Sequence, residues 1–110
     1  MKVINRIKAS KDFAETIKKG TALRNSSFVI HFKANELDYT RIGISVSTKL
    51  GHAVVRNRIK RQIRAMCDSS IDYASHTFDI VIIAKEGFLK CDYHENIKLL
   101  NILLSKIGNL

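Results

Sequence analysis

The chain has 110 residues, of which 45% are hydrophobic, and its formal net charge is +9. This length predicts one domain, residues 1–110, and no apolar run is long enough to span a membrane. The two cysteines, Cys67 and Cys91, lack zinc-ligand spacing, and the N-terminal residues lack the apolar segment of a secretion signal. We therefore expect a soluble, cytoplasmic protein with reduced thiols and no bound metal.

The positive charge is concentrated in the first part of the chain. Residues 1–64 hold fifteen Lys or Arg and four Asp or Glu, whereas residues 65–110 hold four and six. Between Asp38 and Asp68 there are seven Lys or Arg and no acid. Because like charges destabilise a compact state, this concentration predicts a polyanionic partner, and RNA or DNA is the first candidate.

A short helix is predicted near the N-terminus, from Ser10 to about Lys19. Ser10 is a candidate N-cap, and Gly20 after two lysines is a typical stop signal. The basic residues before it lack clear periodicity. They predict an arm that holds Ile4 and Ile7 against the body of the protein.

Two strands are predicted next, at 28–32 and 41–47, with a turn around 35–38 between them. The second segment alternates strictly, so its branched apolar residues face one side and its small residues the other. The small residues on that other side are Gly43, Ser45 and Ser47. They predict an open shelf on one face of a sheet, and there is room for one further early strand.

Gly51 is expected to interrupt regular structure, and a basic helix is predicted after it, from about Ala53 to Met66. Its apolar stripe consists of Val55, Ile59, Ile63 and Met66. The string R-N-R-I-K-R-Q-I-R at 56–64 covers most of the remaining circumference with cations. Such a surface is wide enough to meet more than one phosphate track.

The last part of the chain reads as scaffold. Residues 68–77 predict a polar connection, and the β-branched run 78–84 predicts a central strand buried on both faces. Asp92 and Glu95 have capping-box spacing, before a helix that we expect to stop at Gly108. Together these elements predict an α+β sandwich in a single domain.

Three segments resemble the bacterial ribonuclease P protein subunit. The string K-L-G-H-A-V-V-R-N-R-I-K-R-Q-I-R at 49–64 is similar to the signature of that family. The strand R-I-G-I-S-V-S at 41–47 resembles the strand that precedes the signature. The pattern R-I-K-x-x-x-D-F at 6–13, with a glycine seven residues later, is similar to the family's opening. The resemblance covers nearly the whole chain.

The resemblance implies a specific fold and partner. It implies a four-stranded mixed sheet with three helices, in the order α-β-β-β-α-β-α, and a left-handed βαβ crossover. It further implies that the protein is a monomer bound 1:1 to a large catalytic RNA. Together, the protein and the RNA cut the 5′ leader from precursor tRNA. The RNA carries the active site and its magnesium ions. The protein is therefore expected to contain no catalytic residue, to bind no cofactor of its own and not to bind DNA.

The resemblance also implies which residues meet RNA. The residues that match the RNA-binding helix and its approach are Lys49, Arg56, Asn57, Arg58, Lys60, Arg61 and Arg64. The residues that match or line the cleft for the precursor-tRNA leader are Phe13, Ile17, His31, Ser45 and Ser47. Ile17 stands where many members have Phe, and His31 where some have Tyr, which weakens base stacking. Thr48 replaces a common Lys, and Ala65 a common Glu.

Two other functions fit parts of the pattern. A structural RNA-binding protein of the ribosomal type would share the basic helix without any role in tRNA processing. A protein-only nuclease would need a carboxylate cluster for metals or an acid–base pair, and the carboxylates here avoid the basic surface. Phe13 has two interpretations, as a core residue of an amphipathic helix or as a base-stacking residue.

Overall fold

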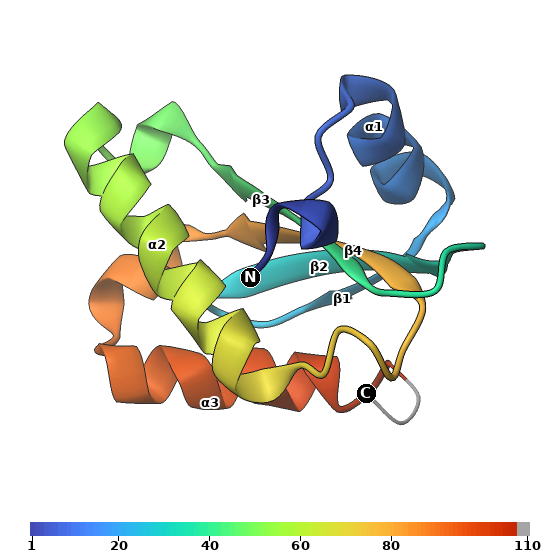
Figure 1. Ribbon diagram of the computed structural model, residues 1–110. Helices are drawn as coiled ribbons and strands as arrows, with labels where there is room; N and C mark the ends of the chain where they lie inside the picture. Colours follow the sequence, from blue (N-terminus) through green and yellow to red (C-terminus); the bar gives the residue numbers. More distant parts are fainter. Residues whose placement is uncertain (108–110) are drawn as a thin grey trace.

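The computed structural model describes residues 1–107, in which three α-helices surround one sheet (Figure 1). The strands are β1 (Thr21–Arg24), β2 (Phe28–Ala34), β3 (Arg41–Val46) and β4 (Phe78–Ala84). The helices are α1 (Ser10–Lys19), α2 (Ala53–Ser70) and α3 (Tyr93–Leu104). Short 3-10 turns are η1 (Val3–Asn5), η2 (Thr48–Leu50) and η3 (Glu86–Lys90). This order confirms the predicted α+β class.

The sheet is mixed, with the strand order β1-β2-β4-β3. β2 runs antiparallel to β1 and to β4, whereas β3 and β4 are parallel. β4 is central as predicted, because Ile80, Val81 and Ile82 have no exposed surface. A continuous β-branched run fits this position, since both faces of the strand are covered.

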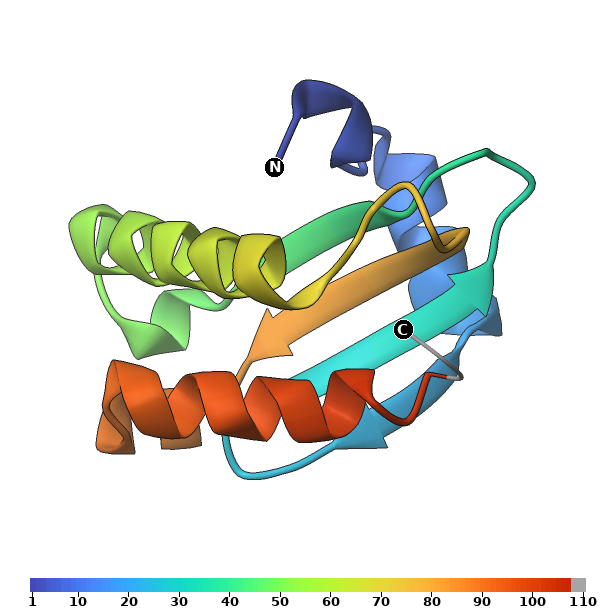
Figure 2. The same cartoon turned by 60° about the horizontal axis from the view of Figure 1, so that its bottom comes forward.

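The parallel pair β3 and β4 is connected through α2. In Figure 2, α2 lies in front of the sheet, both strands run from right to left, and β4 lies below β3. This arrangement makes the crossover left-handed, as the family resemblance implies. Such connections are right-handed in about 98% of proteins, so no general rule predicts this one.

The two faces of the sheet differ in their cover. α2 and α3 cover one face and enclose the main core, in which Phe28, Ile30, Ile63 and Leu100 have no exposed surface. α1 lies on the opposite face and covers only part of it (Figures 1 and 2). The α1 face therefore keeps side chains that are still within reach of a ligand.

The N-terminal segment differs from its prediction in two details. Ser10 is the first helical residue, and Ala9 occupies the cap position without a side-chain hydrogen bond. Ile7 is buried as expected, with its N–H donating to the carbonyl oxygen of Ile42, but Ile4 is 53% exposed. The turn η1 is the reason, because it directs Asn5 inward, where its amide donates to the backbone oxygen of Thr40.

The predicted ends of the two long helices are also wrong. α2 continues to Ser70, four residues beyond the expected end, because Cys67 and Ile71 extend its buried stripe. α3 ends at Leu104, and Ile107 is buried beyond the helix. The expected stop at Gly108 lies outside the described residues. The capping box of Asp92 and Glu95 is confirmed.

Candidate RNA-binding surface

The cations of α2 stand on a helix that is fixed by its buried stripe. Ile59, Ile63 and Met66 are at most 2% exposed, so the rotation of α2 about its axis is set by the core. Of the residues expected to meet RNA, Asn57, Arg58 and Arg61 are exposed and Arg56, Lys60 and Arg64 are half-buried. Within residues 1–107, none of these cations forms an ion pair with an acid. Their charge is therefore not neutralised by the protein itself.

The turn before α2 explains two residues of the signature. Gly51 has φ of 145°, a conformation that residues with a side chain rarely adopt. Its carbonyl oxygen accepts a hydrogen bond of 3.2 Å from Nε of Arg56, so this arginine stabilises the turn while its outer nitrogens remain available. Lys49 lies in η2, just before the turn, and is exposed.

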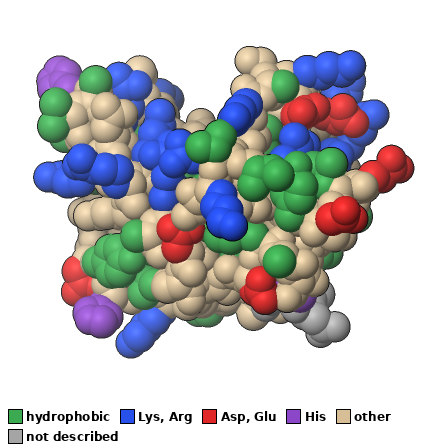
Figure 3. All heavy atoms as spheres, viewed as in Figure 1, with side chains coloured by type: hydrophobic (Ala, Val, Ile, Leu, Met, Phe, Trp, Pro, Cys, Tyr) green, Lys and Arg blue, Asp and Glu red, His purple; other side chains and the backbone are tan. Residues whose placement is uncertain are grey.

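A groove runs between α1 and α2 across β3, and we call it the α1–α2 groove. Figure 3 shows the molecule hollowed between two raised parts, both of which carry Lys and Arg side chains. The residues that line the hollow in this groove are Met1, Arg6, Ile7, Phe13, Ile42, Gly43, Ile44 and Arg64. The fold thus brings Phe13 of the proposed leader cleft beside Arg64 of the basic helix. Arg6 joins them, although sequence reasoning assigned it no role.

The ring of Phe13 lies directly on β3. A Cβ atom at Gly43 would stand only 2.6 Å from Cε2 of this ring, so a side chain at position 43 would displace it. Phe13 is half-buried, which means that one face of the ring packs on the strand while part stays accessible. The structure shows packing of Phe13 on the strand, and its role as a base-stacking residue stays a prediction.

The remaining residues proposed for the leader cleft are divided between two places. His31 pairs with Val81 of β4, which pairs in turn with Gly43 of β3, so the three residues share the α1 face. Ser45 is two residues beyond Gly43 and pairs with Ile83, so it lies on the same face. Ile17 is on α1 and 37% exposed. Ser47, by contrast, lies beyond β3 and accepts a hydrogen bond from the backbone N–H of Lys49.

Ser47 and Lys49 line a second hollow at the carboxyl ends of β3 and β4. Lys85 and Lys90 line the same hollow, and sequence reasoning passed over both. Lys85 and Lys90 are far from the basic string 56–64 along the sequence, so no local pattern connects them with it. Only the parallel pairing of β3 with β4 brings them near Lys49.

The surroundings of His31 favour the neutral form of its imidazole. Burial, followed by the positive charge of Arg24, lowers the pKa of its imidazole. Its Nδ1 atom is buried and has no hydrogen-bond partner among residues 1–107. A neutral imidazole offers a flat surface and a hydrogen-bonding edge, but no charge for a phosphate.

A buried ion pair joins β3 to β4, and one half-exposed contact extends from it to α1. Asp79 of β4 is 1% exposed and accepts hydrogen bonds from Nε and Nη2 of Arg41, at 2.9 and 2.7 Å. Arg41 also reaches Asp12 of α1, at 3.3 Å. Burial raises the pKa of Asp79, but hydrogen bonds from Arg41 and Asn35 and the charge of Arg41 outweigh it and hold the pKa below its usual value. The cluster stabilises the pairing of β3 with β4 beneath the groove and adds one contact to α1.

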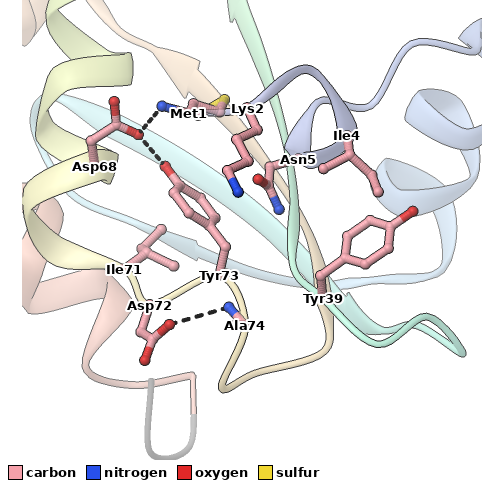
Figure 4. Close-up of a pocket in the computed structure, with 10 residues that line it drawn as sticks. All are labelled: Met1, Lys2, Ile4, Asn5, Tyr39, Asp68, Ile71, Asp72, Tyr73 and Ala74. Carbon is pink, nitrogen blue, oxygen red and sulfur yellow. Dashed lines mark hydrogen bonds and ion pairs between the residues drawn. The ribbon is translucent and has the colours of Figure 1, made fainter.

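The hollow beside the N-terminal segment has the opposite chemistry (Figure 4). Asp68 accepts hydrogen bonds of 2.7 Å from the N-terminal ammonium of Met1 and from the hydroxyl of Tyr73. Asp72 also lines this hollow. This region joins the N-terminal segment to the end of α2, and its two carboxylates make it less favourable for a phosphate than the cations of α2.

Two further properties concern the described residues alone. Residues 1–107 contain no group of three or more His, Cys, Asp or Glu side chains with the arrangement of a metal site. No helix in that range combines the length and the hydropathy that crossing a bilayer requires.

The fold and this surface are those of a small α+β nucleic-acid-binding protein. The family model for ribonuclease P matches residues 1–108, and the chain belongs to this family. The chain is 46% identical over 99 residues to the ribonuclease P protein component of Mesoplasma florum, an alignment that covers 89% of this chain and 90% of that one. It is 42% identical over 109 residues to that of Streptococcus pneumoniae, covering 97% and 89%.

Solved structures agree with this assignment. The RNase P protein of Staphylococcus aureus matches with a TM-score of 0.82 and 38% identity, covering 93% of this chain and 94% of that one. The RNase P protein of Thermotoga maritima matches with a TM-score of 0.81 and 34% identity, covering 94% and 98%. The predicted family and the predicted fold are confirmed.

Proposed function

We propose that the chain acts as the protein subunit of ribonuclease P, the endoribonuclease that removes the 5′ leader of precursor tRNA. In this assignment one copy binds one RNA subunit in the cytoplasm, and the RNA carries the chemistry and its magnesium ions. The main support is the set of α2 cations, which have no acidic partner among the described residues. A polyanion that neutralises them releases counterions and gains affinity.

We further propose a division of labour over the surface. Lys49 and the polar residues of α2 outside the α1–α2 groove hold the RNA subunit, and the groove, which Arg64 lines, holds the leader. Arginine suits the first task because its planar fork meets phosphate oxygens in pairs. A half-exposed ring and a shelf of small residues suit the second, because unpaired bases stack on flat surfaces.

Reconstitution with a bacterial ribonuclease P RNA tests the function. At low magnesium concentration, we expect the protein to increase cleavage of precursor tRNA by the RNA, and the protein alone to cleave nothing. A ribosomal-type RNA-binding protein would bind RNA without changing the cleavage rate or the affinity for precursor tRNA. Cleavage by the purified protein without RNA would contradict the assignment of chemistry to the RNA.

Phe13 tests the position of the leader. Phe13→Ala is expected to weaken holoenzyme binding of leader-bearing precursor tRNA by about tenfold, since base–aromatic stacking contributes about 1–3 kcal/mol per base. Binding of mature tRNA should not change, and equilibrium binding of both substrates measures the difference. Phe13→Leu is the matched control, because it keeps apolar bulk without a ring. If Phe13→Leu restores full leader affinity, Phe13 is only a packing residue.

A further inference from the structure

α2 presents two flanks to two different places. Arg64 lines the α1–α2 groove, whereas Arg58 and Gln62 line a separate notch between α2 and the start of α3. At 100° per residue, positions 58 and 64 lie about 120° apart around the helix. A ligand in the groove therefore does not meet the residues of the notch.

The notch has an apolar floor and an exposed aromatic wall. Ile59 and Phe88 form the floor and are 2% and 4% exposed. Leu89 and Tyr93 stand at its edge and are 52% and 41% exposed. Its volume is about 300 Å³. Leu89 and Tyr93 give this mostly polar hollow an exposed apolar edge on which a flat group can pack.

The polar rim of the notch selects among the parts of a nucleic acid. Arg58 donates hydrogen bonds, Gln62 both donates and accepts, and the carboxylate of Asp92 accepts. Oδ1 of Asp92 already accepts the backbone N–H of Glu95 at 2.8 Å, so the carboxylate is held in place by the helix cap. A carboxylate at the rim repels a phosphate but accepts the amino groups of a base. The Asp92 side of the notch therefore fits the edge of a base, and the Arg58 side fits a phosphate next to it.

We propose that this notch receives one unpaired nucleobase of the RNA subunit, which stacks on Tyr93 while Arg58 and Arg61 hold the flanking phosphates. This inference rests on the proposed function, and it assigns the α3 side of α2 to the RNA subunit and the α1 side to the leader. The RNA subunit is the occupant because the notch adjoins the cations of α2, which have no acidic partner within residues 1–107, and lies outside the groove assigned to the leader.

Equilibrium binding of the RNA subunit at several salt concentrations tests the proposal. Tyr93→Leu keeps apolar bulk but removes the ring, so we expect binding about tenfold weaker with an unchanged salt slope, because no phosphate contact is lost. Tyr93→Phe is the matched control and should bind like the wild type. Arg58→Ala should weaken binding and reduce the magnitude of the slope by about one.

Two further measurements separate the possible failures. Thermal unfolding of each variant shows whether the fold is intact, and the proposal applies only to a loss of affinity in a folded variant. Chemical probing of the RNA should find a base that the wild type protects and Tyr93→Leu exposes. Wild-type affinity in Tyr93→Leu, or a loss confined to leader-bearing precursor tRNA, would overturn the proposal. Failure of the proposed function looks different, because the wild type itself would not stimulate cleavage.

Discussion

Replacing Arg58 and Arg61 together with alanine is expected to weaken binding of the RNA subunit by about 100-fold. Each exposed arginine can form charge-assisted hydrogen bonds, which contribute about 1.5–3 kcal/mol. Neither residue forms an ion pair within the described part of the chain, so its loss leaves no buried partner behind. Titration of the RNA with the double variant measures the effect, and the salt slope should become shallower by one to two units, about 0.7–0.9 per phosphate.

A matched control separates a specific contact from the loss of net charge. Lys98 is an exposed cation in α3, and Lys106 is an exposed cation just after it. The double variant Lys98→Ala, Lys106→Ala therefore removes two positive charges, the same number as the arginine double variant. We expect it to lose little affinity, because long-range attraction is screened beyond about 8–10 Å. Equal losses in the two double variants would show that α2 contributes general charge and no defined contact.

Asp79→Ala is expected to destabilise the fold by about 3 kcal/mol. The substitution removes the acceptor of Nε and Nη2 of Arg41 and one of the two acceptors of the Asn35 amide, in a site where Asp79 is 1% exposed. Breaking a buried pair costs about 3–5 kcal/mol. The lower value applies because the side chain of Arg41 is 20% exposed. Thermal unfolding should show a midpoint lower by about 12–20 °C. Asp12→Ala is the control, since its half-exposed contact with Arg41 contributes less than about 1 kcal/mol.

The same carboxylate gives a pH dependence with a definite sign. The pKa of Asp79 lies below its ordinary value of 3.8 in the folded state. The unfolded chain therefore takes up the proton first as the pH falls, and the stabilisation is present above 3.8 and lost as the pH falls through the folded pKa. Between about pH 5 and pH 3, the wild type should lose more unfolding free energy than Asp79→Ala. Parallel losses in the two proteins would contradict this role.

Local patterns in the sequence predict the elements that local interactions decide. The apolar stripe of α2 and the capping box at Asp92 involve residues three or four positions apart, and the structure confirms both. The wrong predictions arose where distant contacts compete with local signals. Ser10 has the chemistry of a cap, and Ile4 that of a core residue, but the backbone pairing of Ile7 with Ile42 fixes the N-terminal segment differently.

The geometry of the site was less accessible from the sequence. Phe13 and Arg64 are far apart along the chain, and only the order of strands brings them to one groove. Gly43 reads as one small residue in an alternating strand, and its contact with the ring of Phe13 has no sequence signal. The handedness of the crossover came from the family resemblance alone. The roles of individual residues toward RNA stay predictions, for which the experiments above are designed.

The position of β4 in the sheet has a consequence for the newly synthesised protein. β2 and β3 follow each other along the chain, yet β4 lies between them in the sheet. The four-stranded sheet therefore cannot assemble before residues 78–84 have left the ribosome. Until then α2 has no complete surface on which to bury Ile59 and Ile63. Domains fold as units during synthesis, so the cations acquire their fixed arrangement only near the end of translation. An unfinished chain is therefore expected to compete poorly with the complete, folded protein for binding to the RNA subunit.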